Sequence, residues 1–207
     1  MISNPLLTPA MDIQQITGLI LAGGRGSRMG HVDKGLQMFR GAPMAMHVML
    51  RLQPQVGQLL INANQNLGPY EGFGVPVWPD QIPDFAGPLA GLQTGLTHCE
   101  TPYLVSAPCD SPFLPTDLVA RLYAELSRAE ADLAVAVTGA GRERRSHPVF
   151  CLMKNTLLAH LTAFLQDGGR KIDKWYATLN VVEVPFPEES AFRNINTIDE
   201  LHQFEAD

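Results

Sequence analysis

The sequence predicts one α/β domain in which helices flank a mostly parallel sheet. Short apolar runs that are typical of buried strands alternate with helices of about 10–15 residues, which is the pattern of βαβ units. A glycine-rich segment follows the first apolar run, and no linker, low-complexity tract or internal repeat divides the chain. We expect residues 1–14 to be a flexible N-terminal extension and residues 15–207 to form the domain.

The strands are predicted where apolar residues run between polar or glycine-rich turns. They cover residues 17–21, 56–62, 75–78, 103–107, 132–138, 149–153 and 181–185. The polar, basic residues 139–146 are predicted to form a loop.

The helices are predicted from apolar spacing and from the residues at their ends. Met44, Val48 and Leu52, for example, recur at every fourth position between Pro43, which suits a first helical turn, and Pro54, which ends the helix. The predicted helices cover residues 44–53, 87–98, 115–129 and 157–165. Two more follow: one ends near residue 179, and one at 197–204 opens with a capping box.

Composition excludes several classes of protein. The net charge of −6 argues against a general nucleic-acid-binding protein. The three cysteines are widely spaced and form no CxxC pair, so neither a disulfide framework nor a structural zinc site is expected. No apolar run approaches the roughly 18 residues of a membrane span, and residues 1–15 lack the features of a signal peptide. We therefore expect a soluble, cytoplasmic protein that binds neither nucleic acid nor a membrane.

A glycine-rich segment at residues 21–30, with the sequence LAGGRGSRMG, is a candidate phosphate-binding loop, and Asp33-Lys34-Gly35 follows it closely. Glycines let backbone N–H groups approach an anion, while Arg28 and Lys34 can neutralise its charge. A P-loop is excluded because Lys34 is followed by glycine and not by a hydroxyl residue. The dinucleotide fingerprint is excluded because Met29 stands where its third glycine would be.

Seven ordered motifs resemble those of the molybdenum cofactor guanylyltransferase family, within the Rossmann-like nucleotidyltransferases. They are LAGG at 21–24, RMG followed by DKG at 28–35, NAN at 62–64, GPLAG at 87–91, PCD at 108–110, HP at 147–148 and NINT at 194–197. They span nearly the whole chain in the family's order. One departure is His31, which stands where the family usually has a second glycine.

The resemblance implies a single Rossmann-like domain that transfers GMP from GTP to the terminal phosphate of molybdopterin, free or molybdenum-bound, and releases pyrophosphate. The N-terminal half would bind the nucleotide and the C-terminal half the acceptor. Other proteins of molybdenum cofactor biosynthesis and molybdoenzyme chaperones are the implied protein partners.

The resemblance also assigns roles to residues. Lys34 and Arg28 would neutralise charge on the reacting phosphates, and Asp110, which ends a predicted buried strand, would hold Mg²⁺. The implied nucleotide contacts are Leu21, Ala22, Gly23, Lys34, Asn62, Asp80 and Asp110. Asp80 also fits the simpler role of a turn residue after Pro79.

The acceptor side is less defined by the sequence. A phosphate monoester has a second pKa near about 6, so it is already ionised at neutral pH and needs no general base. The candidate acceptor-binding residues are Arg145, His147, Arg170, Lys171, Asn194 and Asn196, although a basic loop can also be merely solvated.

Three alternatives to guanylyl transfer stay open. A molybdopterin cytidylyltransferase or a sugar- or polyol-phosphate nucleotidyltransferase would keep the reaction class and change the substrates. The cytidylyl relatives more often read LAAG, so Gly23 and Gly24 favour guanine. A non-catalytic nucleotide-binding protein would not need both Asp110 and Lys34.

Overall fold

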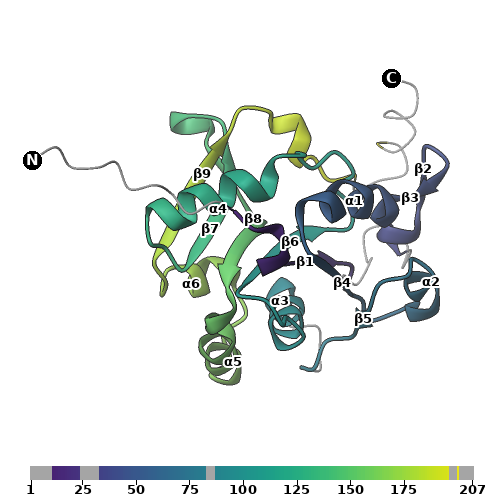
Figure 1. Ribbon diagram of the computed structural model, residues 1–207, viewed down its shortest axis with the longest axis horizontal. Helices are drawn as coiled ribbons and strands as arrows, with labels where there is room; N and C mark the ends of the chain where they lie inside the picture. The colour runs from purple at the N-terminus through teal and green to yellow at the C-terminus, as the bar shows by residue number, and fades with distance from the viewer. Residues whose placement is uncertain (1–10, 24–32, 83–86, 196–199, 201–207) are drawn as a thin grey trace, which may run out of the picture.

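A seven-stranded sheet forms the centre of the part of the chain that the structure describes, with the strand order β5-β4-β1-β6-β8-β7-β9. The structure is a computed structural model that describes residues 11–23, 33–82, 87–195 and 200. In this sheet β8 runs antiparallel to both of its neighbours, and the other adjacent strands pair in parallel (Figure 1). The predicted α/β domain with a mostly parallel sheet is confirmed.

Most of the strands lie where the apolar runs predict them. The sheet strands are β1 (Ile16–Leu21), β4 (Gln58–Asn62), β5 (Val77–Trp78), β6 (Tyr103–Pro108), β7 (Leu133–Thr138), β8 (Arg145–Lys154) and β9 (Val181–Phe186). A small hairpin of β2 (Met38–Phe39) and β3 (Ala42–Pro43), which the sequence did not predict, turns at Arg40 and Gly41 with positive φ.

The prediction of a loop over residues 139–146 was wrong at its end. Arg145 and Ser146 already belong to β8, where they pair with Thr138 and Val137 of β7. The register between the two strands shifts between Val135 and Ala136, so β8 continues beyond the apolar run from which it was predicted.

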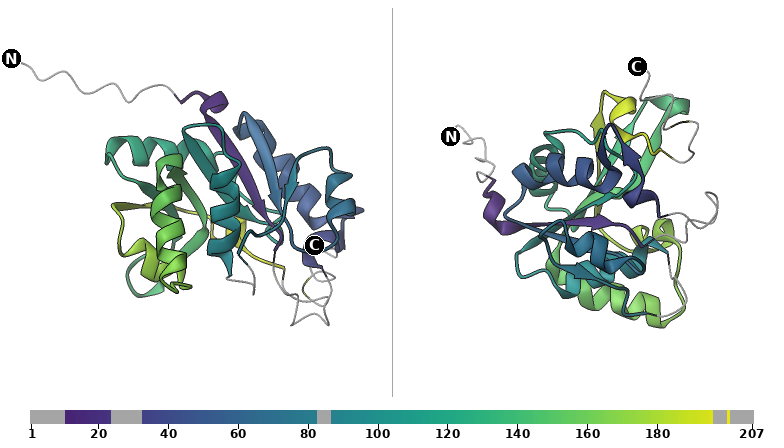
Figure 2. Two further views of the ribbon diagram at one scale, coloured as in Figure 1. Left: turned by 90° about the horizontal axis from the view of Figure 1, so that it is seen from below. Right: turned by 90° about the vertical axis from the view of Figure 1, so that its right-hand side faces the viewer.

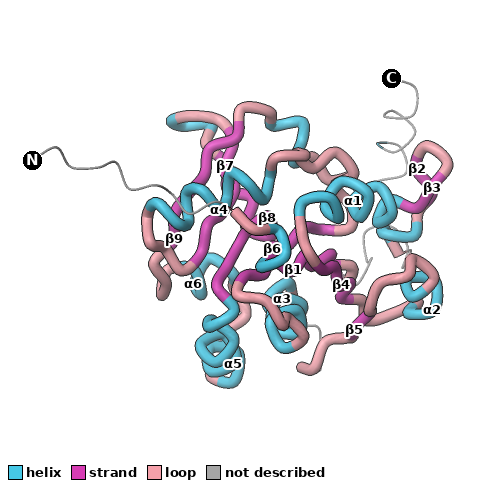
Figure 3. Tube along the Cα trace, in the orientation of Figure 1, coloured by secondary structure: helices cyan, strands magenta, loops and turns pink. Residues whose placement is uncertain are grey.

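Helices cover both faces of the sheet (Figure 2, Figure 3). They are α1 (Met44–Leu52), α2 (Leu67–Glu71), α3 (Pro88–Thr97), α4 (Leu118–Arg128), α5 (Leu158–Gln166) and α6 (Ile172–Tyr176). On one face, α1 and α4 pack on a core that includes Ile20 of β1. On the other, α3, α5 and α6 pack on a core that includes Leu19. Neighbouring β1 residues therefore supply opposite cores, as the alternation of side chains along a strand requires.

The carboxyl ends of β1, β4 and β6 meet at one edge of the sheet. Leu21 pairs with Asn62 on one side and with Pro108 on the other. Beyond this pairing, the Ala22 N–H donates to the Asn62 carbonyl (2.7 Å) and the Cys109 N–H to the Leu21 carbonyl (3.0 Å). The segments after these three strands are thus placed side by side.

Several sequence predictions lie outside the described residues. They are residues 1–10 of the extension predicted over residues 1–14, most of the glycine-rich loop including Arg28 and His31, Asn196, and the final helix apart from Glu200. In the described part of the chain, no helix combines the length and apolar character that crossing a bilayer requires.

Candidate active site

Lys34 and Asp110 form an ion pair at the carboxyl edge of the sheet. The Lys34 Nζ lies 3.2 Å from the Asp110 Oδ2, and both side chains are largely buried. Lys34 opens a short 3₁₀ helix, Lys34–Leu36, and Asp110 comes two residues after the end of β6. The structure thus brings together two predicted catalytic residues that are 76 positions apart in the sequence.

The other carboxylate oxygen of Asp110 is left without a protein partner. Its Oδ1 is buried and accepts no hydrogen bond in the described part of the protein. Burial raises the pKa of Asp110 above its ordinary value of 3.8, although Lys34 acts in the opposite direction. A buried carboxylate oxygen with no donor is costly, so this atom fits a site that a cation completes when substrate binds.

Asp33 and Tyr70 hold the segment that carries Lys34. The Asp33 Oδ1 accepts from the Tyr70 hydroxyl (2.6 Å) and from the Gly35 N–H (3.2 Å), so Asp33 caps the short helix. Tyr70 is fully buried on α2. A Cβ at Gly35 would lie 2.3 Å from the Tyr70 hydroxyl, so only glycine lets the segment lie this close to the ring.

A second group of polar residues, which includes several of the predicted nucleotide contacts, lies at the ends of β1 and β4. The Asn62 Nδ2 donates to the Asp80 Oδ1 (2.9 Å) and to the Trp78 carbonyl (3.1 Å). Asn64 is hydrogen-bonded to both Asp80 and the Gly23 carbonyl. The turn after β5 is therefore tied to the start of the glycine-rich loop through Asp80.

The carbonyl oxygen of the Asn62 side chain faces two glycines. A Cβ at Gly23 would lie 3.0 Å from the Asn62 Oδ1, and one at Gly91 of α3 would lie 2.5 Å from the same atom. Leu21 is also close, since its Cδ2 would lie 2.6 Å from a Gly91 Cβ. The glycines of two motifs, LAGG and GPLAG, therefore leave the space that the buried Asn62 side-chain oxygen occupies.

Cys109 is a packing residue and not a nucleophile. It is buried next to Gly35, whose Cβ would lie 3.2 Å from the Cys109 Sγ. Burial raises the pKa of this thiol well above its ordinary value, and Asp110 raises it further. A thiol that stays protonated is a poor nucleophile.

Two predicted acceptor-side residues lie near the Asp110 segment. The Ser111 hydroxyl donates to the Asn194 Oδ1 (2.7 Å), and the Ile195 N–H donates to the Asp110 carbonyl (2.9 Å). His147 stacks on Phe192, two residues before Asn194, with ring centroids 4.6 Å apart. Asn194 and Ile195, the first two residues of the NINT motif, are therefore attached to the segment that carries Asp110.

His147 is half-buried. Burial lowers its pKa below 6.5, Glu189 raises it and Arg145 lowers it. One ring nitrogen, Nε2, lies 2.8 Å from the Thr138 hydroxyl. The histidine is thus tied to the end of β7, next to Arg145 at the start of β8.

Two of the predicted basic acceptor residues, Arg145 and Arg170, already have protein partners. Arg145 pairs with Glu189 (2.6 Å), and its neighbour Arg144 pairs with Glu183. Arg170 donates to the Leu165 carbonyl (2.8 Å), so its guanidinium caps the end of α5. Lys171 follows it as the N-cap of α6.

The α6 segment lies beside the start of β8, because the Tyr176 hydroxyl donates to the Pro148 carbonyl (2.6 Å).

Asn64 and Tyr70 were not predicted as site residues. Asn64 was signalled by the NAN motif alone, and Tyr70 lies on a five-residue helix without periodicity.

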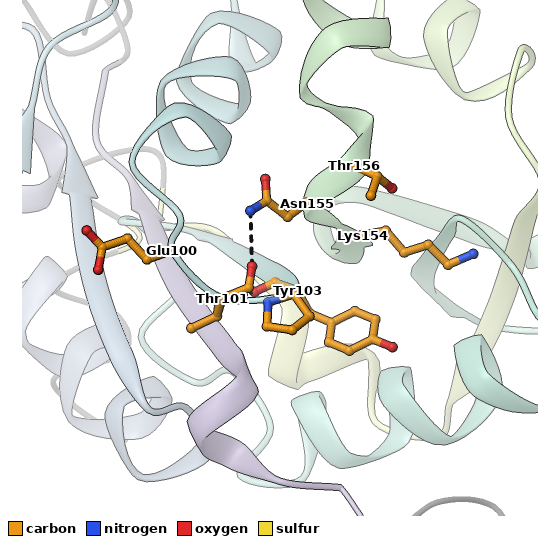
Figure 4. Close-up of a pocket in the computed structure, with 7 residues that line it drawn as sticks. Glu100, Thr101, Tyr103, Lys154, Asn155 and Thr156 are labelled. Carbon is orange, nitrogen blue, oxygen red and sulfur yellow. Dashed lines mark hydrogen bonds between the residues drawn. The ribbon is translucent and has the colours of Figure 1, made fainter.

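A cavity of about 580 Å³ lies at the opposite edge of the sheet (Figure 4). It is lined by Glu100, Thr101, Pro102, Tyr103, Lys154, Asn155 and Thr156. Its lining residues surround the start of β6 and the end of β8, and Asn155 donates to the Thr101 carbonyl (3.1 Å). None of the predicted site residues lines it.

The chain matches known families along most of its length. A family profile described as the MobA-like NTP transferase domain covers residues 18–181. The molybdenum cofactor guanylyltransferase of Bordetella petrii is 62% identical over 193 residues, which are 93% of this chain and 98% of the relative. The chain belongs to the molybdenum cofactor guanylyltransferase family. It is accordingly a nucleotidyltransferase, and the resemblance noted in the sequence is confirmed.

A further relative agrees with this family, and a solved structure shares its fold. The molybdenum cofactor guanylyltransferase of Ralstonia nicotianae is 63% identical over 202 residues, covering 95% of this chain and 98% of the relative. The structure of molybdopterin-guanine dinucleotide biosynthesis protein A from Archaeoglobus fulgidus has a TM-score of 0.71 at 24% identity, over 92% of this chain and 97% of that one.

The fold extends beyond this family. The 4-diphosphocytidyl-2C-methyl-D-erythritol synthase of Anaerococcus prevotii has a TM-score of 0.74 at 11% identity, over 94% of this chain and 98% of that one. At this identity the likeness concerns the fold alone.

Proposed function

We propose that this nucleotidyltransferase transfers GMP from GTP to the terminal phosphate of molybdopterin, with Mg²⁺ as cofactor. The products are molybdopterin guanine dinucleotide and pyrophosphate, and the acceptor is taken free or with molybdenum bound. The names of the relatives support the choice of GTP and of molybdopterin. The observation that carries the proposal is the Lys34–Asp110 pair, with its unsatisfied buried carboxylate oxygen, at the carboxyl edge of the sheet.

The reaction is an in-line displacement at the α-phosphorus of GTP. An oxygen of the acceptor phosphate forms the new bond to this phosphorus, and the bond to the oxygen that bridges the α- and β-phosphates breaks. Pyrophosphate leaves with the electron pair. The acceptor phosphate is already ionised near neutral pH, so no residue has to remove a proton. Catalysis then consists of placing the two phosphates and neutralising their charge.

Lys34 supplies positive charge at the reacting phosphates. Asp33, which precedes Lys34, and Tyr70 fix its position through hydrogen bonds, so little reorganisation is needed when charge develops on the phosphates. Arg28 is proposed for the same role from the glycine-rich loop, on the basis of its motif.

Asp110 is the proposed Mg²⁺ ligand. Its buried, unsatisfied Oδ1 fits a hard cation that prefers oxygen. No cluster of three or more His, Cys, Asp or Glu side chains occurs among the described residues. The remaining ligands would therefore be phosphate oxygens and water, as is common for Mg²⁺ at nucleotides. The bound cation would neutralise phosphate charge.

The nucleotide's base and ribose are proposed to lie against the ends of β1 and β4. There the backbone of Leu21 to Gly23, the Asn62 side chain and Asp80 form one connected surface. Asn62 is nearly fully buried and both amide hydrogens of its side chain bond to protein acceptors. Its oxygen is thereby oriented as an acceptor for a base.

The acceptor is proposed to bind between the NINT segment and the start of β8. Asn194, Asn196 and His147 would contact the phosphate and the ring of the acceptor. Arg145, Arg170 and Lys171 are proposed to contribute positive charge, and binding would require Arg145 to exchange Glu189 for the acceptor.

We place the enzyme in the cytoplasm. Its three cysteines are free and buried, which suits a reducing compartment. There it would exchange the acceptor and product with other proteins of molybdenum cofactor biosynthesis and with molybdoenzyme chaperones.

Incubation of the protein with Mg²⁺, GTP and molybdopterin tests the proposal. We expect one dinucleotide and one pyrophosphate per turnover, loss of activity in EDTA, and no product from CTP. Asp110→Asn keeps the size of the side chain and removes the charge, so it should abolish turnover while leaving the protein folded. Dinucleotide formed from CTP in place of GTP would assign the chain to cytidylyl transfer, and full activity of Asp110→Asn would remove the metal assignment.

A further inference from the structure

Asn64, the last residue of the NAN motif, has no role in the function proposed above. We propose, resting on the function proposed above, that Asn64 sets the nucleobase preference by holding Asp80 and the Gly23 carbonyl as one array of hydrogen-bond acceptors. In this role Asn64 is a positioning residue, and the groups that contact the base are its neighbours.

Asn64 fastens together three segments of the chain. Its Oδ1 accepts from the Asp80 N–H (2.8 Å), and its Nδ2 donates to the Asp80 Oδ2 (2.8 Å). The same Nδ2 donates to the Gly23 carbonyl (3.3 Å), 41 positions away in the sequence. One side chain at the end of β4 therefore fixes both the turn after β5 and the backbone after β1.

The Asp80 carboxylate is clamped by two amides. Asn62 donates to its Oδ1 (2.9 Å) and Asn64 to its Oδ2 (2.8 Å), so the plane of the carboxylate is fixed from both sides. Hydrogen bonds to a carboxylate are among the stronger ones in proteins. Without Asn64 the Asp80 carboxylate would keep one of its two hydrogen bonds from side-chain amides and would be able to rotate.

The array presents acceptors to a ligand. Both hydrogens of the Asn62 amide and those of Asn64 are directed at protein oxygens. The acceptor groups that this network holds at the ends of β1 and β4 are the Asp80 carboxylate, the Gly23 carbonyl and the Asn62 Oδ1, which lies close to Gly23 and Gly91. Such an array binds a base that presents N–H groups, whereas a base without N–H groups would leave these acceptors unpaired.

Guanine matches this array better than the other bases. It carries a ring N–H next to its exocyclic amino group, so it offers adjacent donors to a carboxylate with two oxygens. Hypoxanthine keeps the ring N–H and lacks the amino group. Cytosine has an amino group next to a ring nitrogen that carries no hydrogen. A comparison of GTP, ITP and CTP therefore tests separately what the ring N–H and the amino group of the base contribute to binding.

Calorimetric titration of the full chain with GTP, ITP and CTP, each with Mg²⁺, tests the inference without needing the acceptor. For the unaltered protein we expect GTP to bind at least about tenfold more tightly than ITP. In Asn64→Ala the Kd for GTP should rise about tenfold or more, and the Kd for ITP less than about threefold. The preference for GTP over ITP should therefore nearly disappear.

Two further variants keep the test decisive. Asn64→Asp retains the acceptor for the Asp80 N–H but replaces the amide donor with an oxygen that repels Asp80, so it should lose the same preference even if Asn64→Ala does not fold. Asn180→Ala is the matched control, because Asn180 is exposed and its side chain bonds to the Glu130 carbonyl. It should leave all three affinities unchanged.

Parallel weakening of GTP and ITP in both Asn64 variants would overturn the inference, because it would show a structural role only. Equal affinity of the unaltered protein for GTP and ITP would overturn it as well. Failure of the proposed function would be seen separately, as absence of GMP transfer by a protein that still prefers GTP over ITP.

Discussion

Removing the hydroxyl of Tyr70 tests whether the contacts behind Lys34 position it. Tyr70→Phe keeps the buried ring on α2 and deletes only the donor at 2.6 Å from the Asp33 Oδ1. A hydrogen bond to a charged group contributes about 1.5–3 kcal/mol. We expect a loss near the lower end, about 1.5 kcal/mol, because Asp33 keeps the Gly35 N–H and the Asn66 amide as donors.

The same variant should also be slower. Lys34 follows Asp33 directly, so a looser Asp33 lets the Lys34 ammonium depart from its place next to Asp110. We expect kcat to fall about tenfold, which corresponds to about 1.4 kcal/mol of lost transition-state stabilisation. Urea unfolding gives the stability and steady-state kinetics of dinucleotide formation give kcat.

Tyr103→Phe is the matched control for Tyr70→Phe. Tyr103 opens β6 at the edge of the sheet away from the site, where its ring contacts Tyr123 edge-on. Its stability should stay within about 0.5 kcal/mol of the unaltered protein, and kcat should not change. If Tyr70→Phe lowered the stability and left kcat unchanged, Tyr70 would support the fold without positioning Lys34; an unchanged stability would show that its hydrogen bond contributes nothing.

Three other predictions follow from the site. Because burial raises the pKa of Asp110 above 3.8, the metal-free folded protein binds more protons than the unfolded chain in the interval above that value. Its free energy of unfolding, relative to that of Asp110→Asn, should be greatest below pH 3.8 and should fall as the pH rises through the raised pKa. Urea titrations in EDTA measure this difference, and a free energy of unfolding that rises with pH would contradict the burial effect. Lys34→Ala should lower kcat by about 10²–10³ in steady-state assays; a change only in KM would show that the charge of Lys34 serves binding. Gly91→Ala would put a Cβ 2.5 Å from the Asn62 Oδ1 and 2.6 Å from the Leu21 Cδ2. It should cost about 1–3 kcal/mol of stability and weaken GTP binding in calorimetry, and unchanged values of both would refute the close packing.

Much of the fold was predictable because the apolar runs are unambiguous. The runs that became β1, β6 and β7 are buried on both faces and read as continuous apolar segments. The helix α1 was bounded to within one residue because Pro43 precedes its first residue and Pro54 follows soon after its last. The direction and length of β8 were not predictable, since its first residues are polar and join the sheet only through pairing with β7.

The site was predicted as a set of residues but not as an arrangement. Lys34, Asn62 and Asp110 were identified from motifs and Asp80 from the resemblance to the family, and the strand order β5-β4-β1-β6 is what brings them to one edge. That order depends on contacts between distant segments, which local patterns do not encode. Tyr70 escaped notice for the same reason: its helix contains Gly68 and Pro69, and its role appears only when its hydroxyl meets Asp33.

A structure of the protein with GTP and Mg²⁺ tests the central claim most directly. We expect the metal on the Asp110 Oδ1, the phosphates at Lys34, and the guanine against Asn62 and Asp80. GTP seated elsewhere, for example in the cavity beside Lys154 at the opposite edge, with no metal on Asp110, would contradict the assignment of this edge as the active site.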